Sequence, residues 1–521
     1  SSAVVSDCRN IHKISGSGMA GIAYMSYGRI SNCVNSAEIS GGGGLAGILG
    51  TACGGDTLDH CVNEADIVGS GSTNGGLISD MSNSTDASVI IDCSNQGAVG
   101  GTSYVGGIVG MARGSFDFKR CHNTGDVTGL GHYVGGFAGE LYVKSGTSSG
   151  LIEDCHNTGA VLSNEYAVGG FAGEGGNNLT INRCYNTGDV AGGSRHVAGF
   201  IGQSRSTVIN DCWNSGNVES EGYGVAGIAG YAQGAYITRC FNLGNVTSTK
   251  GSDNADGKYG NAGGLAGYGF PTITDCYNMG TVTAPSLAGG VIGLITSSST
   301  KIRRTYTAGR LVCADAAKAG LIAPNGKYVG VLDSVYYDTD AAQASFTPTA
   351  TDALATACNT RTLATAAKLG DAWAMQQGMY PTLSVQSDND LANWWAATVV
   401  LAEGDTFASV KQRFAYGMPQ GTQWTCDGSR LYLKDGFGYT TGMGAATVTK
   451  TFNGLSKTYT LNVTGLSGLD GVAADAMALG SEWYTVGGVS LGSQRPAASG
   501  VYIEVVRYAG GKTSARKVVL K

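Results

Sequence analysis

The sequence predicts an all-β fold, a parallel β-helix (a β-solenoid) followed by small β-sandwich domains. Three observations lead to this prediction. The phrase CHNTGDVTGLGHYVGGFAG at 121–139 returns, with variations, about every 28 residues along the first 340 positions. Each copy alternates short apolar and polar stretches with Gly, Asn and Ser clusters, which is typical of strands and turns rather than helices. Copies also differ in length, and tolerance of insertions is typical of a solenoid.

Ten of the 14 cysteines mark the repeats, and successive marks lie 25 to 36 positions apart. About 28 residues accommodate three short strands and three turns, so we expect each copy to form one coil. Adjacent coils would then lie ~4.8 Å apart, the spacing of hydrogen-bonded strands. The marking residues are Cys8, Cys33, Cys61, Cys93, Cys121, Cys155, Cys184, Cys212, Cys240 and Cys276.

Composition agrees with a folded β-helix. The chain has 521 residues, 85 of them glycine without the triplet period of collagen, and its 42% hydrophobic content argues against disorder. A net charge of −6 makes nucleic acid an unexpected partner. No apolar run reaches the ~18 residues that a transmembrane helix requires. Ser1 leads almost directly into the first repeat, so we expect that the chain begins after processing or is part of something longer.

Cysteine and asparagine are predicted to form two inward ladders. Side chains on in-register parallel strands point the same way, which is poor geometry for disulfides, so we expect free buried thiols. An asparagine follows each cysteine by two positions, and stacked buried amides can hydrogen-bond along the rod. These residues are Asn10, Asn35, Asn63, Asn95, Asn123, Asn157, Asn186, Asn214, Asn242 and Asn278.

Glycines follow the same repeat. One comes two residues after most ladder asparagines, where we expect a positive φ or a close backbone approach. These are Gly97, Gly125, Gly159, Gly188, Gly216, Gly244 and Gly280. The later G-G-[FIL]-[AV]-G segments are expected to be thin inner strands that let the walls pack closely.

The residue between cysteine and asparagine should face outward, and from position 122 it is a ring in every coil. Such a column can stack on sugar rings, pack against a partner or support a covering segment. Two interpretations remain open, ring-on-ring stacking that stabilises the sheet and contact with a glycan or a surface protein. The candidate contact residues are His122, His156, Tyr185, Trp213, Phe241 and Tyr277.

The repeats resemble GLUG-type repeats, named for a G-L-x-G motif that Gly264–Gly267 (GLAG) matches. Variants occur at 107–110, 136–139, 170–173, 199–202 and 227–230. The resemblance covers about residues 1–340. Such repeats occur in large bacterial surface proteins, including the non-catalytic regions of IgA-specific metallopeptidases. The resemblance therefore implies a cell-surface or secreted bacterial protein, but it implies no activity. None of the six histidines lies in an H-E-x-x-H motif.

After residue 276 the pattern decays. Residues 304–309 keep the spacing of the repeat but lack its Cys and Asn. Residues 319–323 and 334–338 should form the closing coil. We assign 341–390 to a closing segment and linker, with a short helix at 362–369. Within it, Trp373 and the stretch MYPTL at 379–383 resemble the aromatic plug that often ends such repeat regions.

Residues 391–465 are predicted to form an Ig-like β-sandwich. Alternating stretches at 397–402, 429–434, 446–451 and 457–464 lie between turn residues, and 451–454 (TFNG) is an expected hairpin corner. The final SKTYTLNVTG resembles the last strand of bacterial Ig-like modules.

Residues 466–521 resemble the C-terminal sorting domain of type IX secretion substrates in Bacteroidota. Gly500 and Tyr502 match a G-x-Y-x-[VI] motif, and the strand Lys517–Lys521 matches the terminal K-[VI]-x-[VI]-x-K pattern. The resemblance implies outer-membrane secretion and attachment machinery as a partner. Such domains are commonly removed on maturation.

No constellation of catalytic residues is evident. The acids near the ladder cysteines (Asp7, Asp59, Asp92, Asp154, Asp211 and Asp275) are interpreted as one structural turn residue per coil. Without C-x-x-C pairs, zinc is not indicated, and no cofactor is expected. Asp253 and Asp256 could hold calcium, although their spacing departs from the EF-hand loop.

These observations favour a non-enzymatic extracellular or bacterial cell-surface protein that acts as an adhesin or binding stalk. A second hypothesis is a structural subunit or spacer of an extracellular filament or layer, formed through self-association. A third is a β-helix carbohydrate-active enzyme, whose carboxylates would cluster on one face.

Overall fold

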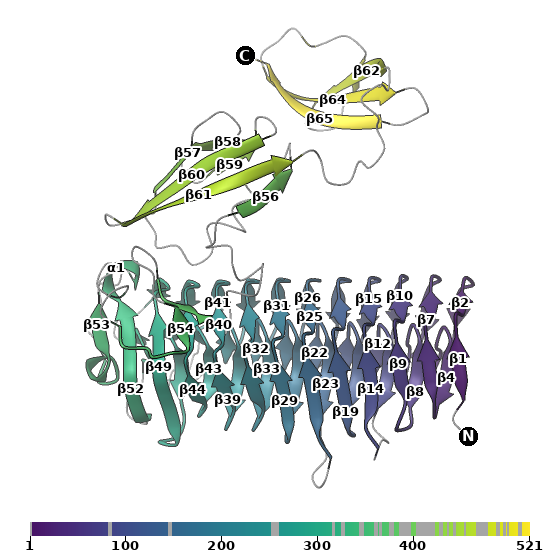
Figure 1. Ribbon diagram of the computed structural model, residues 1–521, viewed down its shortest axis with the longest axis horizontal. Helices are drawn as coiled ribbons and strands as arrows, with labels where there is room; N and C mark the ends of the chain where they lie inside the picture. The colour runs from purple at the N-terminus through teal and green to yellow at the C-terminus, as the bar shows by residue number, and fades with distance from the viewer. Residues whose placement is uncertain are drawn as a thin grey trace.

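A computed structural model shows a parallel β-solenoid with one coil beside the next along a single axis (Figure 1). It describes residues 3–384 except 82–85, 144–147, 252–259, 315–317, 325–328, 343–348, 359–362, 364–366 and 375–379. Beyond 384 it describes Pro496 and the strands β56–β65, whose bounds are given below. The predicted fold class is confirmed.

One coil illustrates the unit. Its strands are β19 (Phe116–Lys119), β20 (His122–Asn123), β21 (Val127–Gly129), β22 (Val134–Gly135) and β23 (Ala138–Tyr142). Each pairs in parallel with its equivalent one coil on, as Val127 does with Val161. The expectation of three strands per coil is therefore wrong. Two-residue strands such as β20 and β22 are too short to show an alternation in the sequence.

The strands stack into four long sheets. One contains 23 strands, because both β19-type and β20-type strands belong to it, and the others contain 11, 9 and 10. The first coil begins with β1 (Val4–Ser6), β2 (Arg9–Asn10), β3 (Ile14–Ser15) and β4 (Ala23–Ser26). Parallel in-register stacking places equivalent repeat positions above one another.

The interior is filled by ladders of identical side chains. The thiols from Cys33 to Cys276 are all fully buried and free. The phenylalanines of the G-G-F segments stack as well, with ring centroids 4.7 Å apart for Phe137 and Phe171 and 4.8 Å apart for Phe171 and Phe200. The predicted cysteine ladder is confirmed for nine of its ten members; Cys8, in the first coil, is exposed, and Cys53, which lies outside the ladder, is only partly buried. The rod has a continuous apolar core.

The asparagine ladder is also confirmed. Each Nδ2 donates to Oδ1 of the asparagine in the next coil, as Asn123 does to Asn157 at 2.7 Å and Asn157 to Asn186 at 2.8 Å. From Asn63 to Asn278 each also donates to a backbone carbonyl two residues on, as Asn157 does to Gly159 at 2.7 Å. The ladder amides are thus hydrogen-bonded in coil after coil, which keeps them from destabilising the core.

The glycines permit close approach. A Cβ added at Gly136 would lie 2.2 Å from Asn157 Cγ, so the asparagine ladder packs directly on this backbone. Likewise, a Cβ at Gly125 would lie 2.0 Å from the carbonyl oxygen of Gly97 in the preceding coil. The glycines after the asparagines do not have positive φ angles. Close approach alone therefore explains them.

Left-handed backbone occurs instead at the residue before each ladder cysteine, with φ of 53° at Asp92 and 52° at Arg120. Five of the six acids, all but Asp59, do occupy this turn, as expected, but aspartate is not present there in every coil, so the expectation of one per coil is wrong. From Asp92 onward, aspartate alternates with arginine: Asp92, Arg120, Asp154, Arg183, Asp211, Arg239, Asp275 and Arg304.

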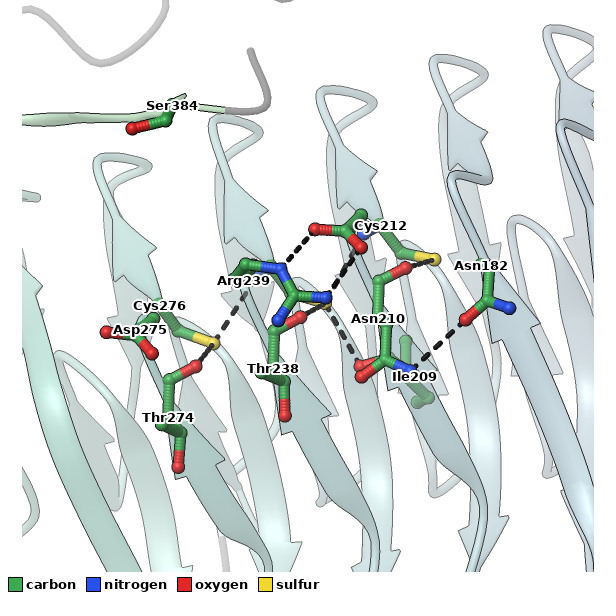
Figure 2. A network of polar contacts seen from close by, with 12 residues as sticks. Asn182, Ile209, Asn210, Cys212, Thr238, Arg239, Thr274, Asp275, Cys276 and Ser384 are labelled. Carbon is green, nitrogen blue, oxygen red and sulfur yellow. Dashed lines mark hydrogen bonds and ion pairs between the residues drawn. The ribbon is translucent and has the colours of Figure 1, made fainter. Parts of the chain in front are cut away.

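The alternating residues form ion pairs between neighbouring coils. Arg239 donates to both carboxylate oxygens of Asp211, at 2.5 and 2.7 Å. Figure 2 shows Arg239 beside the ladder residues Cys212 and Cys276, whose thiols donate to the carbonyls of Asn210 and Thr274. This charge ladder follows the edge of the cysteine ladder.

The last coils use longer strands and a covering segment. β49 (Thr300–Thr307) pairs with β52 (Val329–Asp338), which pairs with β53 (Thr356–Cys358); β50 (Leu311–Cys313) and β51 (Ala319–Gly320) end their sheets. A short helix α1 (Thr339–Ala342) follows β52. β54 (Trp373–Ala374) and β55 (Thr382–Leu383) form a small antiparallel pair. Of the expected helix at 362–369, residues 362 and 364–366 lie outside the described residues, Leu363 is helical and 367–369 are not.

Two further groups of strands follow. β56 (Thr398–Ala402), β57 (Gln423–Cys426), β60 (Gly444–Phe452) and β61 (Leu455–Thr464) form one sheet, and β58 (Leu431–Lys434) pairs with β59 (Phe437–Thr440). Phe452 pairs with Leu455, as the expected hairpin requires. The assignment to the Ig-like class stays a prediction.

The final sheet is antiparallel. Its strands lie side by side in the order β63 (Ser490–Gly492), β62 (Ala478–Thr485), β64 (Gly500–Tyr508) and β65 (Thr513–Leu520). The predicted C-terminal β structure is therefore present in the described strands.

Candidate functional site

The ring column predicted from the sequence is a continuous stack. Ring centroids are 5.0 Å apart for His122 and His156, 4.6 Å for His156 and Tyr185, and 4.5 Å for Tyr185 and Trp213, with interplanar angles of 2–8°. The stack continues through Phe241 and Tyr277. It extends further than expected, because Tyr306 stacks on Tyr277 at 5.1 Å.

The C-terminal half of the column is buried, which corrects the prediction that all six rings are exposed. Trp213, Phe241 and Tyr277 are 3, 2 and 0% exposed. They belong to an apolar cluster that includes Leu363, Leu369, Trp373, Tyr380 and Leu383 of the closing segment. The predicted aromatic plug, Trp373 with the described residues of 379–383, thus packs on the solenoid. The sequence did not show which rings of the column it would cover, since the covering residues lie far along the chain.

Hydrogen bonds attach the closing segment to the solenoid. Tyr306 donates its hydroxyl to the carbonyl of Pro381 at 2.7 Å, and Tyr380 donates to Asp338 Oδ2 at 2.6 Å. The Trp373 indole reaches Asp275. Here the ring column supports a segment of the same chain.

Only His122, His156 and Tyr185 of the predicted contact residues are partly exposed. Burial lowers the pKa of His122, and burial together with His122 lowers the pKa of His156 to about 4. Burial raises the pKa of Tyr185 to about 12. Near neutral pH this end of the column therefore presents uncharged rings with polar atoms. Contact with a glycan or partner stays a prediction for these three residues.

A second surface, which the sequence analysis missed, combines aromatic and charged residues along the flank of the rod. We call it the aromatic–charged face. It lies where the chain turns into the β22-type strands and along the outward positions of the β23-type strands. Its residues are Tyr104, Arg113, His132, Tyr133, Glu140, Tyr166, Glu174, Arg195, His196, Gln203, Arg205, Tyr223, Tyr231 and Tyr268.

The rings of this face contact one another from coil to coil. His132 stacks on Tyr166 with centroids 5.1 Å apart, and Tyr104 lies 5.1 Å from Tyr133. Arg195 lies over the Tyr166 ring at 5.0 Å from the centroid. These tyrosines and His132 are partly exposed, so the face offers accessible ring surface.

Two carboxylates lie beneath these rings on adjacent coils. Glu140 pairs with Arg113 at 2.7 Å and Glu174 pairs with Arg205 at 2.9 Å, and each glutamate side chain is only 6% exposed. Burial raises the pKa of both glutamates, while the arginines and, at Glu174, the Tyr133 hydroxyl oppose that rise. The ion pairs fix the guanidinium groups at the edge of the face.

A buried histidine extends the face. His196 is 9% exposed and stacks on Tyr231 with centroids 4.9 Å apart. Its Nδ1 makes no hydrogen bond within the described part of the chain. Burial, with help from Arg195 and Arg205, lowers its pKa to about 3, so the imidazole is neutral at physiological pH.

The sequence did contain a signal for this face. Aromatic residues precede the V-[GA]-G motif in successive repeats (YVGG, HYVGG, YAVGG, RHVAG and GYGVAG), and glutamate follows G-F-A-G twice. The signal is weak because Tyr104, Tyr133 and His196 have positive φ angles of 55, 59 and 58°. Non-glycine residues rarely adopt that conformation, so alternation does not give their direction.

The other candidate residues lie elsewhere. Gly500, Tyr502 and Lys517 lie on the paired strands β64 and β65, where Tyr502 pairs with Val518. Lys521, Asp253 and Asp256 lie outside the described residues. A sorting role stays a prediction.

One group of metal-ligating side chains occurs among the described residues, formed by Asp59, His60 and Asp92 with ligand atoms within 4.8 Å. Asp59 already pairs with Arg29, and Asp92 with Arg120. The Arg120 hydrogen bond lowers the pKa of Asp92. Because arginines already neutralise both carboxylates, the group favours internal pairing over a cation.

Within the described ranges no helix combines the length and the apolar character that crossing a bilayer needs. Comparisons with protein-family models, with curated proteins and with solved structures found no match to this chain. Function must therefore be argued from the geometry.

Proposed function

We propose that this chain is a non-enzymatic rod of a secreted or cell-surface bacterial protein, and that it acts as an adhesin or binding stalk. The observation that supports the proposal is the aromatic–charged face. Its partly exposed rings lie beside arginines held by buried glutamates, which is typical of a prearranged contact surface. The resemblance of the repeats to GLUG-type surface proteins agrees with it.

The solenoid suits such a role because it is rigid. In coil after coil the asparagine side chains are hydrogen-bonded and the cysteine side chains are buried. The backbone is therefore already ordered, and little conformational entropy would be lost when a ligand binds. The C-terminal sheet would supply the type IX sorting domain, and outer-membrane secretion and attachment machinery would be its partner.

The test is binding by the full chain, measured on glycan and extracellular-protein arrays, together with electron microscopy across a concentration series. We expect saturable binding by isolated rods. Ordered filaments or lattices without ligand binding would contradict the proposal and favour a structural subunit. Cleavage of an arrayed ligand would favour an enzyme.

A further inference from the structure

We propose that the aromatic–charged face binds an oligosaccharide chain lying along the rod, with one sugar residue per coil. This inference rests on the proposed function and names its ligand class. The ring column is a less suitable site, because Trp213, Phe241 and Tyr277 are buried under the closing segment.

The first argument is the repeat distance. Parallel coils lie about 4.8 Å apart, close to the length of one pyranose residue in an extended chain. The ring centroids of the face follow the same step, at 5.1 Å for both Tyr104–Tyr133 and His132–Tyr166. These pairs belong to two adjacent columns, and Ala167 and Arg195 take the equivalent positions in later coils, but every coil from Tyr104 to Tyr223 has a ring in one of the two columns. A sugar chain along the rod would therefore meet at least one ring in each of these coils.

The second argument is chemical. A pyranose has apolar C–H faces and a rim of hydroxyls, so it needs ring surface with hydrogen-bonding groups beside it. Tyr133 supplies ring surface, since Ala167 takes its position in the next coil, whereas the ring of Tyr166 lies between His132 and Arg195. Arg113 and Arg205, held by Glu140 and Glu174, supply fixed donors.

The third argument concerns unused polar groups. Arg195 is exposed and forms no ion pair among the described residues; its guanidinium lies over Tyr166. His196 Nδ1 is an unpaired buried polar atom beside it. Of the two, Arg195 is the group that a ligand can reach, because the Nδ1 atom of His196 is buried. Arg195 also suits a uronate carboxylate.

The experiment uses the full chain and an array of oligosaccharides at least five residues long, both neutral (glucan, mannan, galactan) and acidic (polyuronate). Affinity for the best ligand is then measured by calorimetry. We expect Tyr133→Ala and Arg195→Ala each to weaken binding roughly tenfold, because each removes one stacking or charge-assisted contact. Selective binding of the acidic set, with the larger loss at Arg195→Ala, would identify a carboxylate contact.

The matched control is Tyr236→Ala, which removes a 53% exposed tyrosine elsewhere on the solenoid. Unchanged thermal unfolding of the variants confirms that they fold. Oligosaccharide binding that withstands both face variants but weakens in Tyr185→Ala would place the ligand on the ring column and overturn the inference, while the proposed function would stand. Protein binding without oligosaccharide binding would also overturn it and leave the proposed function intact.

Discussion

The indole nitrogen of Trp373 donates a hydrogen bond of 3.1 Å to Oδ1 of Asp275, 98 positions earlier in the chain. The same carboxylate accepts from Arg304 at 2.6 and 2.7 Å. The closing segment is therefore attached to the last pair of the charge ladder, and the rings of Tyr277 and Tyr306 lie beneath it.

Trp373→Ala should detach this segment. The change removes a 6% exposed indole and the bond to Asp275, so we expect a local loss of about 3–5 kcal/mol. Hydrogen exchange should accelerate between Leu363 and Leu383 while the central coils stay protected. Leu354→Ala is the control, because Leu354 is 68% exposed. Unchanged exchange in the segment would contradict the role of the indole.

Asn157→Ala should destabilise the solenoid. It leaves Asn123 Nδ2 without its acceptor and Asn186 Oδ1 without its donor, both in the core. At ~1–3 kcal/mol for each unsatisfied group, we expect a loss of about 2–4 kcal/mol in the free energy of unfolding, measured with denaturant. Asn164→Ala, at an exposed turn position, should change it little. Equal losses in both variants would argue against the ladder.

Gly136→Ala and Gly100→Ala form a pair that separates close approach from glycine content. A Cβ at Gly136 would lie 2.2 Å from Asn157 Cγ and from the carbonyl oxygen of Gly170, whereas one at Gly100 meets only the Ile67 carbonyl oxygen at 3.7 Å. We expect Gly136→Ala to lower the melting temperature strongly or to prevent folding, and Gly100→Ala to be neutral or slightly stabilising. Similar melting temperatures for the two would refute the explanation.

The histidines of the ring column should make stability depend on pH. The folded-state pKa of His156 is lowered to about 4, below the ordinary 6.5. The unfolded chain then binds more protons between these values, so stability is full above pH 6.5 and falls as the pH decreases toward 4. His156→Phe keeps a ring and should weaken this dependence in melting experiments from pH 7.5 to 4.5. An unaltered slope would show that other groups cause it.

Thiol labelling should distinguish the ladder from the remaining cysteines. The ladder thiols from Cys33 to Cys276 are fully buried, and burial raises the pKa of Cys155 and Cys184 well above the ordinary value. In the native protein iodoacetamide should modify Cys8, which is exposed, and more slowly Cys53 and Cys313. Peptide mapping would detect the ladder thiols only after denaturation. Rapid native labelling of Cys155 would contradict the packing.

Particular residues show what the sequence could predict. Cys121 and Asn123 recur at one repeat position, and stacking turns such recurrence into ladders, so their burial followed from the pattern alone. The burial of Trp213 did not follow, because its cover comes from residues that match no repeat. Asp92 and Arg120 alternate at one repeat position, but the pairing of their charges depends on the left-handed turn that brings them together. Tyr133 was missed because its left-handed backbone lies outside the rule of alternation.

The charge ladder groups the coils of the rod into pairs. From Asp92 onward the ion pairs join coils two by two, Asp92 with Arg120, Asp154 with Arg183 and so on to Asp275 with Arg304. Deleting one coil would set aspartate against aspartate or arginine against arginine, whereas deleting two would restore every pair. Two coils are therefore the unit by which this part of the rod can change length. Genetic duplication or excision should preserve the fold best when it adds or removes an even number of coils.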